Sequence, residues 1–190
     1  MKDKNLKTKI LDKALMTEYL DEILKIEFDT STRLGVDSYG SPWTEENFLS
    51  EREGKWEFST AVISEGKLLS YLISSKWLNN LHGHRMAMVI DLKTDLKIFL
   101  QKQLYVKQQE VVLSKGIYMT TAMVPEKNLS TIKYYLKEGW KELNKEELGE
   151  FISGREMDCH VEDSNILVDN QPEPGHPSRA KVLKFLSKAH

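Results

Sequence analysis

The chain has 190 residues, enough for one domain with its own hydrophobic core and few for two. Its 27 Lys and Arg residues nearly balance 29 Asp and Glu residues, and the net charge of -2 argues against a nucleic-acid-binding or anionic-membrane-binding protein. No apolar run approaches the ~20 residues that cross a bilayer. The single cysteine, Cys159, excludes an internal disulfide. We therefore expect a cytoplasmic protein without nucleic-acid or membrane partners.

The first half of the chain predicts two helices followed by strands. Apolar residues at helical spacing from Leu20 to Phe28 predict a helix capped by Thr17, and residues 29–41 are expected to form a polar loop. Thr44 is the predicted N-cap of a second helix. Strands are predicted over residues 56–64, 68–77 and 85–92, the first two joined as a hairpin by the turn at residues 64–67, and the third buried on both faces.

The next segment reads as a long helix, a strand and a shorter helix. Thr94 and Asp95 begin the long helix, and Gly116 ends it. Residues 117–124 are a predicted strand, after which Asn128 caps a helix that Gly139 closes. This order of strand, helix and strand indicates an α/β protein with a mixed sheet and helices on both faces.

The last fifty residues carry weaker signals. Residues 140–161 predict two final strands. Residues 164–178 are polar and contain three prolines, which favours a linker, and residues 179–190 suggest a short basic helix. We therefore expect a domain over residues 1–163, followed by a linker and terminal helix over residues 164–190.

The segment that begins at Asn128 carries a recognisable motif. It reads Asn-Leu-Ser-Thr-Ile-Lys-Tyr-Tyr-Leu-Lys-Glu-Gly-Trp and resembles the Asn-x-x-x-Ile-x-x-Tyr-x-x-x-Gly-Phe signature of the Gcn5-related N-acetyltransferase (GNAT) superfamily, with Trp140 in place of Phe. Three further motifs resemble those of ribosomal-protein alanine N-acetyltransferases: Pro42-Trp43-Thr44-Glu45 followed by Phe48, Val89-Ile90-Asp91, and Gly154-Arg155-Glu156-Met157-Asp158. The resemblance spans residues 14–163 in order.

The resemblance implies the acyl-CoA N-acyltransferase fold, acetyl-CoA as cosubstrate, no metal, and an amine of a small molecule or protein as acceptor. The strands that end at Asp91 and Val124 would be parallel neighbours that splay apart to pair with pantetheine. Tyr135 would be the acid that protonates the departing thiolate. The residues implied to bind the cofactor are Val89, Ile90, Asp91, Lys97, Asn128 and Tyr135.

The sequence departs from the family in the loop that holds the CoA pyrophosphate. Relatives place a Gln/Arg-x-x-Gly-x-Gly/Ala loop at the start of the long helix, where backbone N–H groups face the phosphates. The matching residues 93–101 contain no glycine, and Asp95 adds a negative charge. Affinity for CoA should therefore be low.

A second departure concerns the general base. Many of the ribosomal-protein enzymes carry an acidic residue five positions before the Asn, where this chain has Met123. Asp91, Glu126, His84 and a water chain remain as candidate bases. The motif His82-Gly83-His84 has no evident third metal ligand. A catalytically reduced copy of the fold, serving as a binding or structural module, is the alternative, and the acceptor and any homo-oligomer stay open.

Overall fold

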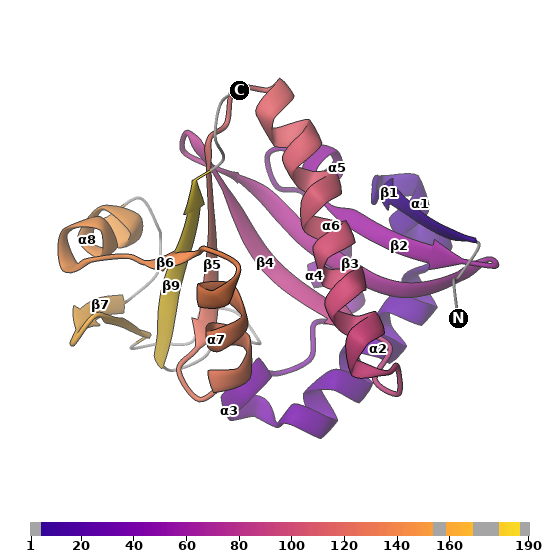
Figure 1. The fold of residues 1–190 in the computed structure, drawn as a ribbon, viewed down its shortest axis with the longest axis horizontal. Helices are drawn as coiled ribbons and strands as arrows, with labels where there is room; N and C mark the ends of the chain where they lie inside the picture. Colours follow the sequence, from indigo (N-terminus) through magenta and orange to yellow (C-terminus); the bar gives the residue numbers. More distant parts are fainter. Residues whose placement is uncertain (1–4, 154–158, 169–178, 187–190) are drawn as a thin grey trace.

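A single mixed β-sheet organises the part of the chain that the computed structural model describes, residues 5–153, 159–168 and 179–186. The order of its strands is β1-β2-β3-β4-β5-β9-β8-β7, with β6 paired to β9 (Figure 1). All pairs are antiparallel except β4 with β5, which is parallel. The strands are β1 (Leu6–Ile10), β2 (Thr60–Ser64), β3 (Lys67–Trp77), β4 (Asn80–Met88), β5 (Met119–Pro125), β6 (Lys141–Glu142), β7 (Cys159–Glu162), β8 (Asn165–Val168) and β9 (Arg179–Leu186).

Helices cover both faces of this sheet, as the sequence predicts. They are α1 (Lys13–Glu18), α2 (Leu20–Leu34), α3 (Val36–Tyr39), α4 (Glu45–Leu49), α5 (Lys55–Phe58), α6 (Thr94–Ser114), α7 (Leu129–Lys137) and α8 (Lys145–Ser153). Helices α6 and α7 lie on one face and pack on side chains such as Leu72 and Val124, respectively. Helices α2 and α8 lie on the other face, against Ile73 and Met123, respectively. None of the described helices is long and apolar enough to cross a membrane.

Strands β4 and β5 pair over a short stretch and then separate. Their parallel register joins Leu81, His82 and Gly83 to Thr120, Thr121 and Ala122, and the strands then diverge toward their carboxyl ends (Figure 1). The register of β3 against β4 shifts between Ile73 and Ser74, which makes His84 the extra residue of a β-bulge. A bulge bends its strand and so favours this divergence. The predicted pair of splayed parallel neighbours is confirmed.

Local signals placed several helix ends correctly. Thr44 caps α4 in a capping box with Asn47. Helix α6 begins at the predicted Thr94 and ends before Gly116, whose φ of 71° suits a residue without a side chain. Asn128 caps α7 as predicted, because its side chain accepts a hydrogen bond from the N–H of Thr131.

The predictions for residues 13–41 were partly wrong. Thr17, the predicted N-cap, lies within α1, which Asp12 caps, and the predicted helix is α2, which follows Tyr19 and continues to Leu34 through much of the predicted loop. Phe28, expected on the apolar face, is 62% exposed. The buried stripe of α2 instead continues through polar residues such as Glu27, which a count of apolar residues misses.

The strand boundaries also needed correction. Helix α5 occupies the start of the strand predicted over residues 56–64, and β4 begins at Asn80, before the predicted residue 85. Leu78 takes a positive φ of 52° in the tight turn between β3 and β4. The end of β4, expected to be buried on both faces, is half-buried at Met86 and Met88 because these residues line a cavity.

The C-terminal predictions were the least accurate. Helix α8 was not predicted, β8 lies within the predicted linker, and the predicted basic helix is β9. Strand β9 pairs with β5, and its charges are neutralised from outside the strand by ion pairs from Lys181 to Glu142 and from Lys184 to Glu147. The rest of the predicted linker, residues 169–178, and the motif at residues 154–158 lie outside the described residues.

Candidate active site

A cavity of about 590 Å³ lies between the diverging ends of β4 and β5. Its walls come from α2, α3, β3, β4, the first half of α6, the end of β5 and α7. The site therefore joins segments that lie far apart in the sequence. Of the residues implied by the family resemblance, Ile90, Lys97, Asn128 and Tyr135 line this cavity.

Tyr135 is held rigidly on the side of the sheet that carries α6 and α7. Its side chain is buried, with a ring centroid 4.6 Å from that of Trp140, and its hydroxyl is hydrogen-bonded to the hydroxyl of Tyr105 on α6. Trp140 also contacts the ring of Tyr105, at 5.5 Å. Sequence reasoning did not single out Tyr105, because its hydrogen-bond partner lies 30 positions away on another helix.

Burial raises the pKa of Tyr135 to about 12, with the hydrogen bond from Tyr105 acting in the opposite direction. The phenol should therefore stay protonated at neutral pH, as an acid must. Because the folded-state pKa lies above the ordinary value of about 10, the stability contributed by Tyr135 should be present below pH ~10 and lost as pH rises toward ~12. In a spectrophotometric titration, Tyr135→Phe should remove an ionisation near pH 12. Loss of one near pH 10 would contradict this.

Asn128 uses its amide to hold two elements together. Its Oδ1 accepts hydrogen bonds from Thr131 N at 3.2 Å and Ser130 Oγ at 3.1 Å, and its Nδ2 donates to the carbonyl of Ser38 at 3.0 Å. The side chain therefore caps α7 and ties it to α3. A pantetheine contact through this amide stays a prediction.

The other implied cofactor residues lie around the carboxyl end of β4. Lys97 donates a hydrogen bond through Nζ to the carbonyl of Ile90. Val89 does not line the cavity, and its N–H donates to Leu69 O at 2.9 Å. The side chain of Asp91 is 90% exposed and pairs with Arg33 at 3.5 Å.

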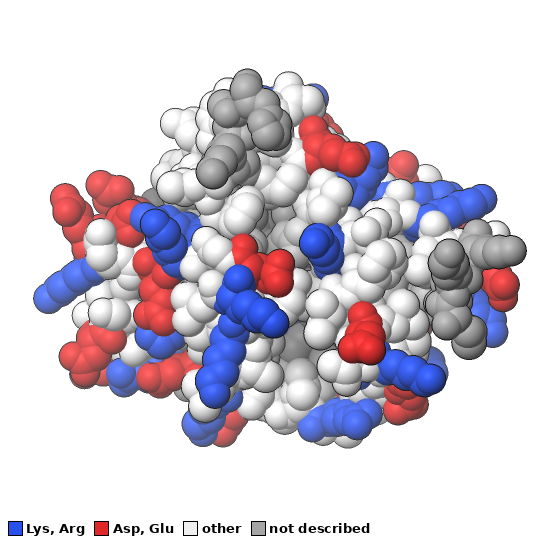
Figure 2. Space-filling model, in the orientation of Figure 1, with Lys and Arg blue, Asp and Glu red and all other residues white. Residues whose placement is uncertain are grey.

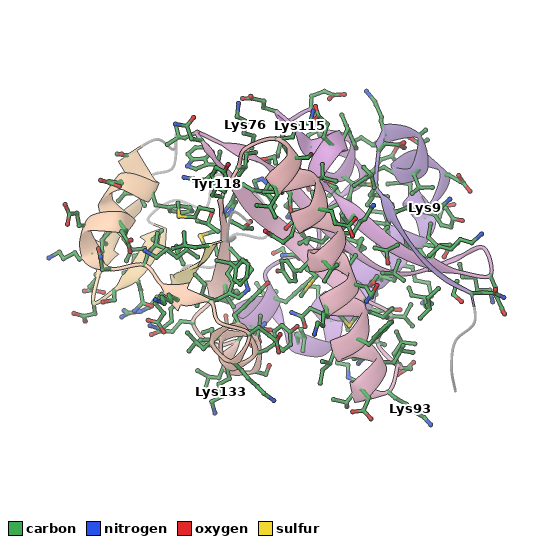
Figure 3. All side chains as sticks on the ribbon, turned by 45° about the horizontal axis from the view of Figure 1, so that its top comes forward. Lys9, Lys76, Lys93, Lys115, Tyr118 and Lys133 are labelled. Carbon is green, nitrogen blue, oxygen red and sulfur yellow. The ribbon has the colours of Figure 1, made fainter. Side chains whose placement is uncertain are left out.

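The first turn of α6 forms one lip of the opening. Lys93 at this end and Lys133 on α7 both point outward into solvent (Figure 3). Over the whole face that carries α6 and α7, described acidic and basic side chains are interspersed (Figure 2). The lip therefore offers isolated cations rather than a continuous basic surface.

A buried polar network forms the wall of the cavity on the α2 side of the sheet. Glu27 is fully buried, and its carboxylate accepts hydrogen bonds from the hydroxyls of Tyr39 and Tyr71, the main-chain N–H of Trp43 and the guanidinium of Arg85. The guanidinium of Arg85 lies 3.8 Å from the centroid of the Tyr39 ring. Because Tyr39 and Trp43 line the cavity, this network fixes the shape of its wall. Sequence reasoning missed it, since its members lie up to 58 positions apart.

Two histidines lie beside each other on β4, with ring centroids 4.8 Å apart. The Nδ1 atom of His82 is 2.9 Å from Thr121 Oγ1, and the Nε2 atom of His84 is 2.6 Å from Ser75 Oγ. Across the described residues, no group of three His, Cys, Asp or Glu side chains could hold a metal ion. The arrangement offers a phenol on one face of the sheet and imidazoles on the other.

Comparison with known proteins adds information about the fold. No protein-family model and no curated protein sequence matches this chain. Among solved structures, the ribosomal-protein-S18-alanine N-acetyltransferase from Escherichia coli has a TM-score of 0.61 at 15% identity, covering 97% of this chain and 96% of that chain. Ard1 from Thermoplasma volcanium has a TM-score of 0.63 at 10% identity, covering 97% and 99%.

A third structure was solved with a cofactor. The PaiA N-acetyltransferase from Thermoplasma acidophilum, in complex with coenzyme A, has a TM-score of 0.56 at 12% identity, covering 95% of this chain and 98% of that chain. At such identities the likeness concerns the fold. The chain has the GNAT acyl-CoA N-acyltransferase fold, and the fold prediction is confirmed.

Proposed function

We propose that this protein is an N-acetyltransferase that moves an acetyl group from acetyl-CoA to an amine of a small molecule or a protein. The observation that carries the proposal is the Tyr135 hydroxyl, which lies in one cavity with the diverging ends of β4 and β5. The coenzyme A bound to a structural neighbour of the same fold supports the choice of donor.

The open edge of β4 suits a pantetheine arm. Because Val89 directs its N–H toward β3, the alternation of a strand directs the main-chain groups of Met88, the last residue of β4, toward β5. Met88 lines the cavity where β5 has moved away. An extended amide-containing chain can pair there as an added strand would.

In this proposal Tyr135 assists departure of the sulfur. Acetyl-CoA supplies an activated thioester. As the C–N bond to the amine forms and the C–S bond breaks, the thiolate needs a proton, which the Tyr135 hydroxyl can donate. Tyr105 can then donate a hydrogen bond to the phenolate, because the two hydroxyls are already in contact. This hydroxyl pair argues against a catalytically reduced copy of the fold.

The site fits the phosphate groups of acetyl-CoA less well than its pantetheine arm. The first turns of α6 carry side chains at every position from Lys93 to Gln101, with Ile98 and Phe99 exposed and Asp95 near the helix start. The absence of glycine keeps a pyrophosphate from a close approach to the backbone. Lys97 is the cation of this helix that lines the cavity, and its ammonium group already donates a hydrogen bond to Ile90 O.

Binding should therefore depend mainly on the pantetheine arm. We expect acetyl-CoA and acetyl-pantetheine to bind with dissociation constants within about tenfold of each other, since few charge-assisted hydrogen bonds to phosphate are available. Isothermal calorimetry with both ligands at two salt concentrations measures this ratio. A preference for acetyl-CoA of about 10²-fold or more that falls with salt would contradict this account of α6.

The activity itself is tested by release of free CoA thiol. The purified protein, supplied with acetyl-CoA and a panel of amines that includes peptide N-termini, lysine side chains and small primary amines, should release thiol and form an N-acetyl product detectable by mass spectrometry. Binding of acetyl-CoA without acetylation of any amine in the panel would count against the transferase and for a binding module.

A further inference from the structure

An acetyltransferase needs a proton acceptor for its amine substrate. Among the described residues that line the cavity, none is Asp or Glu. Its titratable and charged groups are Arg33, Tyr39, His82, His84, Arg85, Lys97, Tyr105, Tyr134 and Tyr135. An alkyl amine reaches the site at neutral pH mainly as an ammonium ion, which must lose a proton before it can attack. Of the side-chain types present, imidazole suits that task near neutral pH.

The carboxylates considered from the sequence lie elsewhere. Asp91 points into solvent and pairs with Arg33. Glu126 is held by Arg179, with Glu126 Oε2 2.8 Å from Arg179 Nε. Neither carboxylate lines the cavity. The histidines of β4 therefore remain.

His82 has a structural role that its hydrogen bonds define. Its side chain is buried, with its ring 5.5 Å from that of Phe151. Thr121 Oγ1 donates a hydrogen bond to the carbonyl of Leu81 at 3.3 Å. In the bond of 2.9 Å between His82 Nδ1 and this hydroxyl, the imidazole N–H is therefore the donor. His82 is thus a core residue that fixes β4 to β5.

His84 lies where the two strands begin to separate. The last paired residues of the parallel register are Gly83 and Ala122, so His84 and Met123 are the next residues on each strand. The bulge turns His84 to the same face as Ser75, its hydrogen-bond partner at 2.6 Å. Met123 packs on α8 at that same face. The imidazole is half-buried and lines the cavity.

Tyr135 and His84 lie on opposite faces of the sheet. Tyr135 approaches the splay from the face of α6 and α7, where it packs with Ala122 and Val124. His84 approaches it from the face of α2 and α8. In acyl transfer the nucleophile and the leaving group occupy different positions around the carbonyl carbon, so a base on one face and an acid on the other match its needs.

We propose that His84 is the general base of the transferase, with Ser75 orienting its ring. The inference rests on the proposed acetyltransferase function. The imidazole takes one proton from the acceptor ammonium and so frees the lone pair that forms the C–N bond. The nitrogen loses a second proton as the amide forms, and Tyr135 gives one proton to the sulfur as the C–S bond breaks. Of the two protons that leave the nitrogen, one is balanced by the thiol proton and the other is released to solvent, and exchange with solvent returns both side chains to their starting states.

The test is the variant His84→Gln, which keeps a polar group near Ser75 and cannot take up the proton. We expect kcat/KM for the amine to fall by about 10²-fold or more at pH 7, with acetyl-CoA affinity and Tm nearly unchanged. Activity of the variant should rise steadily with pH and approach the wild-type value where the free amine predominates. A merely structural loss would lower the rate equally at every pH.

A second variant tests the position of the base. Met123→Glu, added to His84→Gln, places a carboxylate on the neighbouring strand at the same level and face, and should restore kcat/KM at pH 7 by at least about tenfold. His82→Asn, which can still donate to Thr121, should keep the shape of the wild-type pH profile. A changed profile in that variant would move the base to His82.

The outcomes separate the two proposals. Wild-type protein that releases thiol, together with a His84→Gln variant of unchanged rate and pH profile, would overturn the base assignment alone. Wild-type protein that binds acetyl-CoA and acetylates no amine would overturn the proposed function.

Discussion

Tyr135→Phe should lower kcat by about 10²-fold or more, the usual effect of losing a positioned acid. The aromatic ring that packs against Trp140 is kept, so acetyl-CoA affinity should change by less than about threefold. The variant also loses the hydrogen bond between the Tyr135 and Tyr105 hydroxyls. We expect this loss to lower the free energy of unfolding by about 1–3 kcal/mol. Steady-state kinetics with thiol detection measures the rate, and urea unfolding measures the stability.

Tyr134→Phe is the matched control for this prediction. Tyr134 lies on the same helix, lines the same cavity and has a pKa raised by burial and by Glu138 to about 12. Its hydroxyl has no part in the proposed proton transfer, so kcat should stay within about threefold of wild type. Equal losses in both variants, or an unaltered rate in Tyr135→Phe, would show that Tyr135 is a packing residue.

Local signals in the sequence predicted the parts of the fold that depend on neighbouring residues. Caps and glycines placed the starts of α4 and α7 and the end of α6, because a cap is a contact between residues three positions apart. The Glu65-Gly66 turn likewise placed the β2–β3 hairpin, with both residues at positive φ.

Elements stabilised by distant residues were not predictable in this way. The segment Arg179–Leu186 carries apolar residues that suit either a helix face or a strand. It forms a strand because it pairs with the edge of β5. Its Lys181 and Lys184 find partners on β6 and α8, whose positions the sequence does not reveal. Tertiary pairing therefore overrides local propensity here.

The candidate site shows the same division. A motif of fixed spacing identified Tyr135 and Asn128, and both line the cavity. Tyr105 and the buried pair of Glu27 and Arg85 carry no motif, because their contacts cross from helix to helix or from helix to sheet. A charged residue in a helical stripe, as Glu27 is, suggests exposure until its partner is known.

Glu27→Gln should lower the free energy of unfolding by about 3–5 kcal/mol, because it leaves the guanidinium of Arg85 buried without its counter-charge. Gln can accept some of the same hydrogen bonds, so that the loss reports mainly the missing charge. Urea denaturation measures it. Asp29→Asn is the matched control on the same helix: it breaks the exposed pair with Lys25 at 2.8 Å, and should change stability by less than about 1 kcal/mol.

The double variant Glu27→Gln with Arg85→Met separates charge from packing. If the penalty comes from an unpaired buried cation, removing that cation should recover a large part of the lost stability, and the two changes will not be additive. Tyr39 and Trp43 both donate hydrogen bonds to the Glu27 carboxylate and line the cavity. Glu27→Gln alone should therefore also make the cavity wall on the α2 side less rigid and raise the KM for the amine. Additive losses in the double variant would mean instead that Glu27 and Arg85 stabilise the fold through separate contacts.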